Sequence, residues 1–244
     1  KAPKRPSTEC RQFYRWSDRY VGAEVLFSSP TTSLVSSFGH LGIILRQHHD
    51  GPPEFTDAVF QFVGLLGAGS PSTIMRRVLL AKTPLILHAV SFSEFEEENT
   101  KRQDRYIEHY PVQLTPDAFV WFKARLWEQL RRYEAEYGFM GENCAIQVAR
   151  VFEVSLFLGG ALGPPGLSNS PAAVLSRLQR SALLGRVPQT TPSLSQSAAR
   201  VQAAMAKVLH KWPDASRRPP TTGLHPAAAL DAWASWFSTE PAAH

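Results

Sequence analysis

Short apolar segments separated by polar turns predict a β-sheet in the first half of the chain. Each segment is rich in aliphatic, β-branched or aromatic residues and is bounded by glycine, proline or polar positions, as is typical of strands. They comprise residues 41–45, 57–63, 84–92 and 106–114, and a further apolar stretch at 23–27 precedes them. The polar turn at 48–53 lies between two of them, so we expect a hairpin and an antiparallel sheet.

From residue 115 onward, apolar residues recur every three or four positions, which predicts helices. Thr115 can cap the first helix and Pro116 suits its first position. The apolar stripe of this helix comprises Phe119, Phe122, Leu126, Leu130 and Tyr133. A glycine-rich break at 138–141 precedes the next predicted helix. The later helices are expected at 144–158, 171–184, 195–212 and 226–237.

These patterns predict an α+β fold in three parts. Residues 1–20 are expected to form a basic, irregular N-terminal arm, and residues 21–185 a domain of strands and helices. Within that domain, residues 94–105 are expected to be a charged connection. Residues 186–244, rich in proline and serine between helical segments, are expected to form a helical C-terminal extension.

Composition describes a folded protein, because 43% of the 244 residues are hydrophobic and 19% are charged. The net charge of +5 suits an anionic membrane surface. The cations are scattered, and adjacent ones form no more than pairs, so we expect no nucleic-acid partner. Cys10 and Cys144 lie in no metal-ligand spacing, and we expect neither a metal nor another cofactor.

The chain starts without methionine or an apolar signal region, and we expect that an exporting segment precedes it in the full protein. The longest apolar stretch, 148–162, is interrupted by Arg150 and Glu153 and is not expected to span a membrane.

Cys144 is the first candidate for chemistry, because it follows Asn143 at the predicted start of a helix. A thiolate is the reactive form of cysteine, and unpaired amides at a helix start favour negative charge there. The same amides could hold an oxyanion. A buried structural cysteine is the alternative reading.

His40 is the candidate general base, since it follows a glycine and opens a predicted strand. His88 and His109 also lie in predicted strands and compete with it. Gln61 lies in the middle of the following strand. If that strand pairs with the one after His40, Gln61 could orient the imidazole, as the third member of a triad does.

Other residues are open for the orienting role, and Gln61 could instead be a solvent-facing residue of its strand. The alternatives are Asp104, Glu108 and Glu142.

Four segments in order resemble the bacterial Lnb-type lipoprotein N-acyltransferase family. Residues 36–40 resemble its Ser-x-Phe-Gly-His signature, and residues 137–144 its Tyr-x-Phe-x-x-Asn-Cys motif. Between them, 104–114 resembles its Arg-Asp-x-Trp-Glu-Tyr-x-Leu segment and 126–128 its His-Leu-Trp-Glu element. The resemblance covers about residues 20–185.

The resemblance implies a circularly permuted papain-like or NlpC/P60-like domain, with an antiparallel sheet and a helix that begins at the nucleophile. It implies that Cys144 is the nucleophile and His40 the base, and Gln61 falls where relatives often have asparagine. The chain departs from the pattern at residues 145–146 and by one position within 104–114, which leaves the substrate open. Further residues are expected to bind substrate. They are Ser37, Phe38, Asn143, Phe60 and Phe62.

The resulting hypothesis is an extracytoplasmic thiol acyltransferase that acts on a lipid or lipoprotein, near or at a membrane surface. An NlpC/P60-like amidase or peptidase of cell-wall peptides could use the same Cys-His pair. A catalytically degenerate domain that binds a partner is the third reading. The sequence sets neither the acyl donor and acceptor nor the oligomeric state.

Overall fold

The computed structural model describes residues 8–31, 39–48, 51–65, 83–132, 143–156, 170–185 and 188–210, with short pieces at 70, 72–73, 76, 135–137 and 158. An antiparallel sheet organises this part of the chain, with strand order β6-β4-β3-β2-β1-β5-β7. The strands are β1 (Gly22–Ser28), β2 (His40–Arg46), β3 (Ala58–Gly64), β4 (Thr83–Ser91), β5 (Ile107–Pro111), β6 (Ala135–Tyr137) and β7 (Gln189–Thr191). The structure therefore confirms the α+β class and the four predicted strands, and it adds β1, which contains the apolar stretch at 23–27, and two short edge strands.

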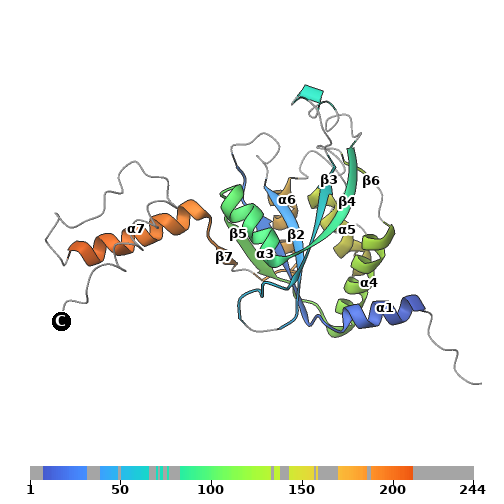
Figure 1. Cartoon of the computed structure of the whole chain (residues 1–244). Helices are drawn as coiled ribbons and strands as arrows, with labels where there is room; N and C mark the ends of the chain where they lie inside the picture. Colours follow the sequence, from blue (N-terminus) through green and yellow to red (C-terminus); the bar gives the residue numbers. More distant parts are fainter. Residues whose placement is uncertain are drawn as a thin grey trace, which may run out of the picture.

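Helices lie on both faces of the sheet (Figure 1). On one face α5 packs against β2 and β3, α6 packs against β1, and α4 packs against α5. On the other face α3 and the π-helical turn η2 follow β4 directly. The helices are α1 (Thr8–Ser17), α3 (Phe92–Glu96), η2 (Glu97–Arg102), α4 (Pro116–Arg132), α5 (Cys144–Ser155), α6 (Pro171–Arg180) and α7 (Leu194–His210).

The starts of α4, α5, α6 and α7 confirm the predicted helices. In α4, the amide of Ala118 donates to Oγ1 of Thr115 over 3.3 Å, as its capping role requires. The predicted helix at 226–237 lies outside the described residues. In Figure 1, α7 extends away from the sheet beyond β7.

Successive side chains of each strand point to opposite faces of the sheet, where they pack in two separate cores. Phe60 and Phe62 of β3 belong to the larger core, which α4, α5 and α6 cover. Val59 belongs to the smaller core beneath α3, where it packs with Phe92 and Phe95. Because successive residues of a strand point to opposite faces, Gln61 and Val63 share the face of Val59.

The expectation of an irregular segment at residues 1–20 is wrong. Within residues 1–20, α1 is helical, and its Trp16 packs against Trp127 of α4 with tilted rings and 5.2 Å between ring centroids. Lys123 of α4 also donates to the carbonyl oxygens of Ser17 and Tyr20, over 2.8 and 3.2 Å.

The charged segment 94–105 does connect two strands, β4 and β5, and most of it is helical, in α3 and η2. Ser91 and Glu94 form a capping box in which each side chain accepts from the backbone amide of the other residue. This pairing satisfies two amides at the helix start and so stabilises it.

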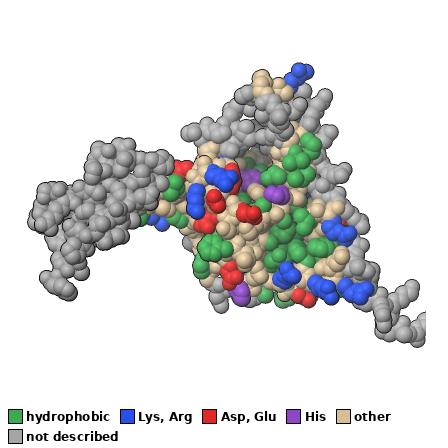
Figure 2. Space-filling model, in the orientation of Figure 1, with side chains coloured by type: hydrophobic (Ala, Val, Ile, Leu, Met, Phe, Trp, Pro, Cys, Tyr) green, Lys and Arg blue, Asp and Glu red, His purple; other side chains and the backbone are tan. Residues whose placement is uncertain are grey.

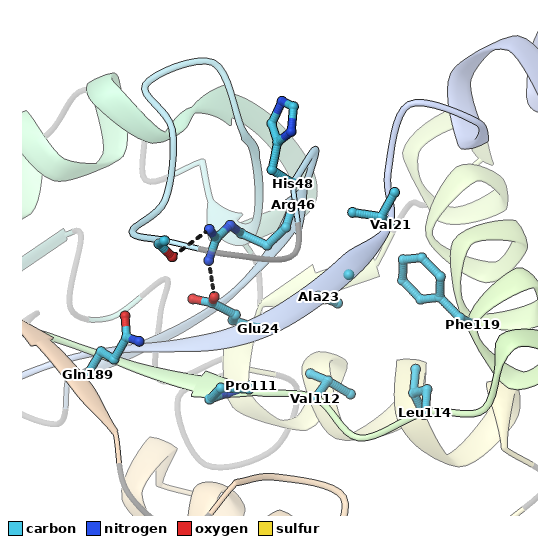
Figure 3. A pocket seen from close by; sticks show the side chains of 12 residues that line it. Val21, Ala23, Glu24, Arg46, His48, Pro111, Val112, Leu114, Phe119 and Gln189 are labelled. Atoms are coloured by element: carbon cyan, nitrogen blue, oxygen red, sulfur yellow. Dashed lines mark hydrogen bonds and ion pairs between the residues drawn. The ribbon is translucent and has the colours of Figure 1, made fainter.

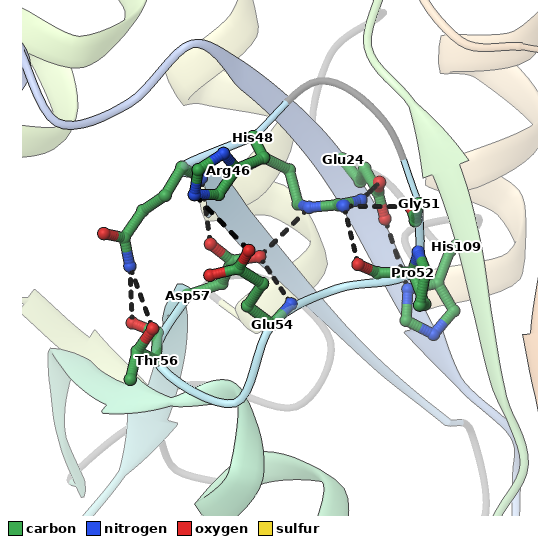
Figure 4. A network of polar contacts seen from close by, with 10 residues as sticks. Glu24, Arg46, His48, Gly51, Pro52, Glu54, Thr56, Asp57 and His109 are labelled. Carbon is green, nitrogen blue, oxygen red and sulfur yellow. Dashed lines mark hydrogen bonds and ion pairs between the residues drawn. The ribbon is translucent and has the colours of Figure 1, made fainter.

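The buried side chain of Arg46 stabilises the hairpin formed by β2 and β3 (Figure 4). Arg46 is ion-paired with Glu24 and, over 3.0 Å, with Asp57. It also donates to the carbonyl oxygens of Gly51 and Pro52 over 3.0 and 2.9 Å. Since the bonds reach β1, β3 and the hairpin loop, they hold the far end of β2 in place.

Candidate active site

Cys144 lies at the first position of α5, where the sequence predicts it. The preceding Asn143 caps this helix, because its side-chain oxygen accepts from the amide of Ile146 over 3.1 Å. The carbonyl oxygen of Asn143 accepts from the amide of Gln147 over 3.2 Å. The third and fourth amides of the helix, those of Ile146 and Gln147, are bound in this way. The first two amides, those of Cys144 and Ala145, are therefore left to donate to the sulfur of Cys144.

The sulfur of Cys144 is buried among backbone amides. Its residue is 7% exposed. Burial raises the pKa of the Cys144 thiol, while hydrogen bonds from the amides of Leu41, Ala145 and Cys144 itself and the charge of Arg105 oppose this rise. Leu41 is the residue after His40, so the sulfur lies against the start of β2.

His40 is the first residue of β2 and carries a buried ring nitrogen, Nε2, that has no hydrogen-bond partner. Burial lowers the pKa of His40 to about 4, and the charge of Arg105 adds to this effect. A hydrogen bond with the Gln61 side chain opposes this and raises the pKa of His40. At neutral pH the imidazole is therefore uncharged and able to accept a proton.

Gly39 sets the position from which His40 enters the strand. Its φ is +78°, a backbone conformation that favours glycine. A Cβ atom at this position would lie 2.7 Å from the carbonyl oxygen of Ser28 on β1. Only glycine therefore lets the chain approach β1 this closely just before the candidate base.

The structure brings Gln61 to His40 through the pairing of β2 with β3. Gly42 lies directly opposite Gln61, which places Gln61 beside the start of β2 and on the same sheet face as His40. The pairing on which its orienting role depends is thus present, together with the hydrogen bond itself.

Arg105 is a further residue at this site, and the sequence analysis does not identify it. It is 3% exposed, and its charge acts on both His40 and Cys144. Ile107 of β5 is paired with Ser28 of β1, and Ser28 is paired with His40 of β2. Arg105, two residues before Ile107, therefore lies at the same end of the strands as His40. Only the order of the strands in the sheet reveals this placement.

The competing residues have other partners. His109 is 2% exposed and both ring nitrogens are bound, one to Glu24 at 3.2 Å and the other to Thr191 at 2.9 Å. Glu108 accepts from the Tyr110 hydroxyl over 2.7 Å. His88 is exposed and lies opposite Gln61 on β4.

Of the remaining candidates for the orienting role, Asp104 accepts from the amide and hydroxyl of Ser195, over 2.9 and 2.6 Å. Glu142 lies outside the described residues.

Of the residues expected to bind substrate, the structure describes Asn143, Phe60 and Phe62. Ser37 and Phe38 lie outside the described residues. Asn143 caps α5, as described above. Phe60 and Phe62 are each 1% exposed in the larger core, so these side chains offer no surface to a ligand in this structure.

A pocket of about 420 Å³ lies at the opposite end of β2 from His40 (Figure 3). Glu24 and Arg46 form its polar side, and Val112, Leu114 and Phe119 its apolar side. The charges of Glu24 and Arg46 neutralise each other across a direct ion pair. The pocket and the cysteine are therefore separate features of the molecule.

Two further searches apply only to the described part of the chain. No group of three or more histidine, cysteine, aspartate or glutamate side chains is arranged to hold a metal ion there. None of its helices is both long enough and apolar enough to cross a bilayer. Neither cysteine forms a disulfide.

Comparison with known proteins places the chain in a family. Residues 14–161, more than half of the chain, match the family described as the Lnb N-terminal periplasmic domain. No curated protein and no solved structure matches the chain. The match agrees with the resemblance in the sequence motifs and with the expected extracytoplasmic location. The chain, with its cysteine at the start of α5 and its histidine at the start of β2, belongs to the Lnb family of periplasmic domains.

Proposed function

We propose that this domain is a thiol acyltransferase, which moves a fatty acyl chain from a lipid or diacylglyceryl ester to the N-terminal amine of a lipoprotein. One observation carries the proposal. The sulfur of Cys144 lies among the amides of Leu41, Ala145 and Cys144, and Leu41 directly follows His40, whose side chain is hydrogen-bonded to Gln61. This arrangement supplies a nucleophile, a base and an orienting group.

In the first half-reaction, uncharged His40 takes the proton of the Cys144 thiol as the sulfur attacks the ester carbonyl carbon. A carbon–sulfur bond forms, and the amides of Cys144 and Ala145 stabilise the oxyanion. The carbon–oxygen bond then breaks, and the leaving alkoxide takes the proton from His40. The products are a thioester on Cys144 and an alcohol.

In the second half-reaction, the acceptor amine attacks the thioester carbon and a carbon–nitrogen bond forms. His40 removes a proton from the amine, the carbon–sulfur bond breaks, and the sulfur recovers that proton. The product is an amide, and the enzyme returns to its starting state. Water competes with the amine, so exclusion of water from the site favours transfer over hydrolysis.

The electrostatics of the site support base-assisted attack by a neutral pair. Burial raises the pKa of the Cys144 thiol, and burial also lowers the pKa of His40, so the resting pair is uncharged. A buried, uncharged pair suits an apolar substrate, since no preformed ion pair has to be desolvated when a lipid binds.

The order of the elements supports a permuted papain-like arrangement within this proposal. The histidine strand precedes the cysteine helix along the chain, and the helix packs against an antiparallel sheet. The basic composition, with a net charge of +5, favours work at an anionic membrane surface.

The test is to trap the acyl-enzyme on the intact chain. After incubation with phospholipid in detergent, mass spectrometry should show a fatty acyl adduct that hydroxylamine removes. Cys144→Ala should abolish this adduct. Cys10→Ser should retain it, because Cys10 lies exposed on α1.

Parallel incubations separate the alternatives. Cleavage of cell-wall peptides through Cys144, without any acyl adduct from lipid, would replace the acyltransferase by an amidase or peptidase. Absence of both reactions would favour a degenerate binding domain. An adduct that persists in Cys144→Ala would exclude Cys144 as the nucleophile.

A further inference from the structure

Asp104, the residue before Arg105, joins the candidate site to the C-terminal segment. Its carboxylate accepts from the backbone amide of Ser195 over 2.9 Å and from the hydroxyl of Ser195 over 2.6 Å. Ser195 lies in the first turn of α7, where a carboxylate interacts favourably with the amides of the helix start and with the helix dipole. Ser195 also lies beyond residues 14–161, so the contact links the site to a segment outside the family match.

Asp104 has an uncommon backbone conformation immediately before Arg105. Its φ is +50°, in the left-handed region that residues other than glycine rarely adopt. Such a conformation persists where the surrounding structure holds it, and the two bonds to Ser195 do so here. Without these bonds the chain would relax towards an ordinary φ, and the direction in which it enters Arg105 would change.

The two residues that follow Asp104 are also held, each by a different part of the fold. The amide of Arg105 donates to the carbonyl oxygen of Asn99 in η2 over 2.8 Å. The amide of Tyr106 donates to Oγ of Ser29 over 3.2 Å, and the amide of Ser29 donates to the carbonyl oxygen of Tyr106 over 3.0 Å. Three consecutive residues are thus fixed by α7, by η2 and by the residue after β1, with Arg105 in the middle.

The register of the sheet places this segment at the candidate site. Ile107 is paired with Ser28 and Ser28 with His40, so these three side chains lie on one face of the sheet. Two strand spacings, about 10 Å, separate β5 from β2. The side chain of Arg105 is 3% exposed, and its charge acts across β1 on His40 and also on the sulfur of Cys144.

The negative groups that act on Arg105 differ in strength. Burial lowers the pKa of Arg105, and this is opposed first by charge on Cys144 and second by Glu98. Glu98 belongs to η2, where it accepts from Arg102 and Gln103. Figure 2 shows acidic and basic side chains gathered on the surface over α3 and η2. A negative sulfur is therefore a stronger electrostatic partner of the buried guanidinium than this exposed carboxylate.

We propose that Asp104 is a positioning residue, which through its contact with Ser195 holds the guanidinium of Arg105 at the candidate site. The positive charge placed in this way stabilises negative charge on the sulfur of Cys144 and disfavours protonation of His40. For catalysis the inference rests on the proposed function, because the same charge would favour attack and departure of the sulfur. The C-terminal segment thereby influences the chemistry of the site as well as the stability of the domain.

The pH dependence of Cys144 alkylation tests this inference without acyl transfer. In the intact chain with Cys10→Ser, the rate of reaction with iodoacetamide follows the fraction of Cys144 thiolate. Arg105→Met removes the positive charge and should shift the rate profile to higher pH, whereas Arg105→Lys should largely restore it. Asp104→Ala should shift the profile in the same direction, by no more than Arg105→Met does, since it acts through Arg105.

The sign of the shift separates positioning from a direct effect of charge. Asp104→Ala also removes a negative charge, which by itself would move the profile to lower pH. Ser195→Ala alters no charge, and by removing the hydroxyl bond it should give a smaller shift to higher pH. The matched control is Ser197→Ala, which removes a hydroxyl two residues further along α7 and should leave the profile unchanged.

The double variant shows whether Asp104 acts through Arg105. Asp104→Ala added to Arg105→Met should cause no further shift, and a further shift would overturn the inference. It would also be overturned if Arg105→Met left the profile unaltered, or if Asp104→Ala and Ser195→Ala left it in place or moved it to lower pH. Asp104 and Ser195 are exposed, so their substitution leaves the cores intact, and circular dichroism and urea midpoints check this.

The acyl adduct separates this inference from the proposed function. The predicted shifts without any adduct from phospholipid would leave the role of Asp104 standing and remove acyl transfer. An adduct that forms equally fast in Asp104→Ala, together with an unshifted alkylation profile, would overturn the inference and leave the function.

Discussion

The protonation state of the Cys144 thiol determines how the site responds to simple reagents. Burial raises the pKa of this thiol despite three backbone amides and the charge of Arg105. A thiol reacts with iodoacetamide through its thiolate, and each unit of pKa changes the thiolate fraction about tenfold. At pH 7 the sulfur of Cys144 is therefore held mainly as the unreactive thiol.

We predict that iodoacetamide labels Cys144 at pH 7 more slowly than it labels a free model thiol, since less thiolate is present. Peptide mass spectrometry of the Cys10→Ser chain measures this rate. Rapid labelling would contradict the raised pKa. Slow labelling agrees with an active or an inactive domain, so the acyl adduct remains the test of activity.

His40 should make the fold sensitive to moderate acid. Its pKa in the folded state is about 4, against a reference value of 6.5, so the unfolded chain binds a proton first as pH falls. The contribution of His40 to the free energy of unfolding is therefore constant above pH 6.5, and it is lost as the pH falls from 6.5 to 4. The shift corresponds to about 3 kcal/mol in the free energy of unfolding.

In His40→Gln this loss should disappear, since glutamine does not titrate. Urea denaturation at several pH values measures the difference. His48→Gln provides the control, because the His48 side chain is 68% exposed. An unaltered pH dependence in His40→Gln would show that the imidazole is not desolvated as the structure describes.

The sequence predicts some residues of the candidate site and misses others for physical reasons. Cys144 follows from its place at a helix start, and His40 from its place after Gly39 at a strand start. Both are local features. Arg105 depends on strand order, which local patterns do not encode. For Phe60 and Phe62, aromatic character indicates burial but does not distinguish a core from a ligand groove.

At the scale of elements, the β2–β3 hairpin depends on one buried cation. Arg46 and Asp57 are 4% and 0% exposed, and Glu24 is 7% exposed. Burial opposes ionisation of Glu24, but its hydrogen bond with His109 and the charge of Arg46 outweigh this and lower its pKa. Removing the arginine would leave two buried carboxylates without their counter-ion.

We predict that Arg46→Met lowers the free energy of unfolding by about 3–5 kcal/mol, because breaking a buried ion pair leaves uncompensated charge. Urea denaturation measures this loss. Arg102→Met is the control, as the Arg102 side chain is 68% exposed in its pairs with Glu97 and Glu98. The control should change stability by less than about 1 kcal/mol. Equal effects of the two substitutions would contradict the role of the buried network.

Strands and helices differed in how well local pattern predicted them. Four strands follow from β-branched and aromatic runs, because their side chains pack in the two cores. Helix α1 depends on Trp16 meeting Trp127 of distant α4, so its short polar sequence alone does not reveal it. Helix α3 has a local signal in the Ser91–Glu94 capping box, which the charged composition of the segment obscures.

At the scale of the whole molecule, the two ends of β2 serve different purposes. His40 opens the strand beside the sulfur, and Arg46 closes it within the buried ion network. The strand is central in the sheet, between β1 and β3. The network therefore fixes the end of the strand that lies opposite to the candidate site.

Residues after 185 also take part in the sheet, through β7 and its pairing with β5. The buried ring of His109 bonds to Thr191 of β7 on one side and to Glu24 of β1 on the other. This contact makes the start of the C-terminal segment a part of the folded domain. The sequence analysis places a domain boundary after residue 185, because the proline- and serine-rich composition beyond it gives no sign of the three-residue strand β7.

We predict that Thr191→Val lowers the free energy of unfolding by about 1–3 kcal/mol, since it leaves a buried histidine nitrogen without its partner. A chain that ends at Gly185 should lose at least as much, because it lacks β7 altogether. Thr190→Val is the matched control, as Thr190 is exposed on the same strand. Urea denaturation of the four chains measures these differences. If the shortened chain were as stable as the full one, β7 would contribute nothing to the sheet, and residues 186–244 would be a separate extension.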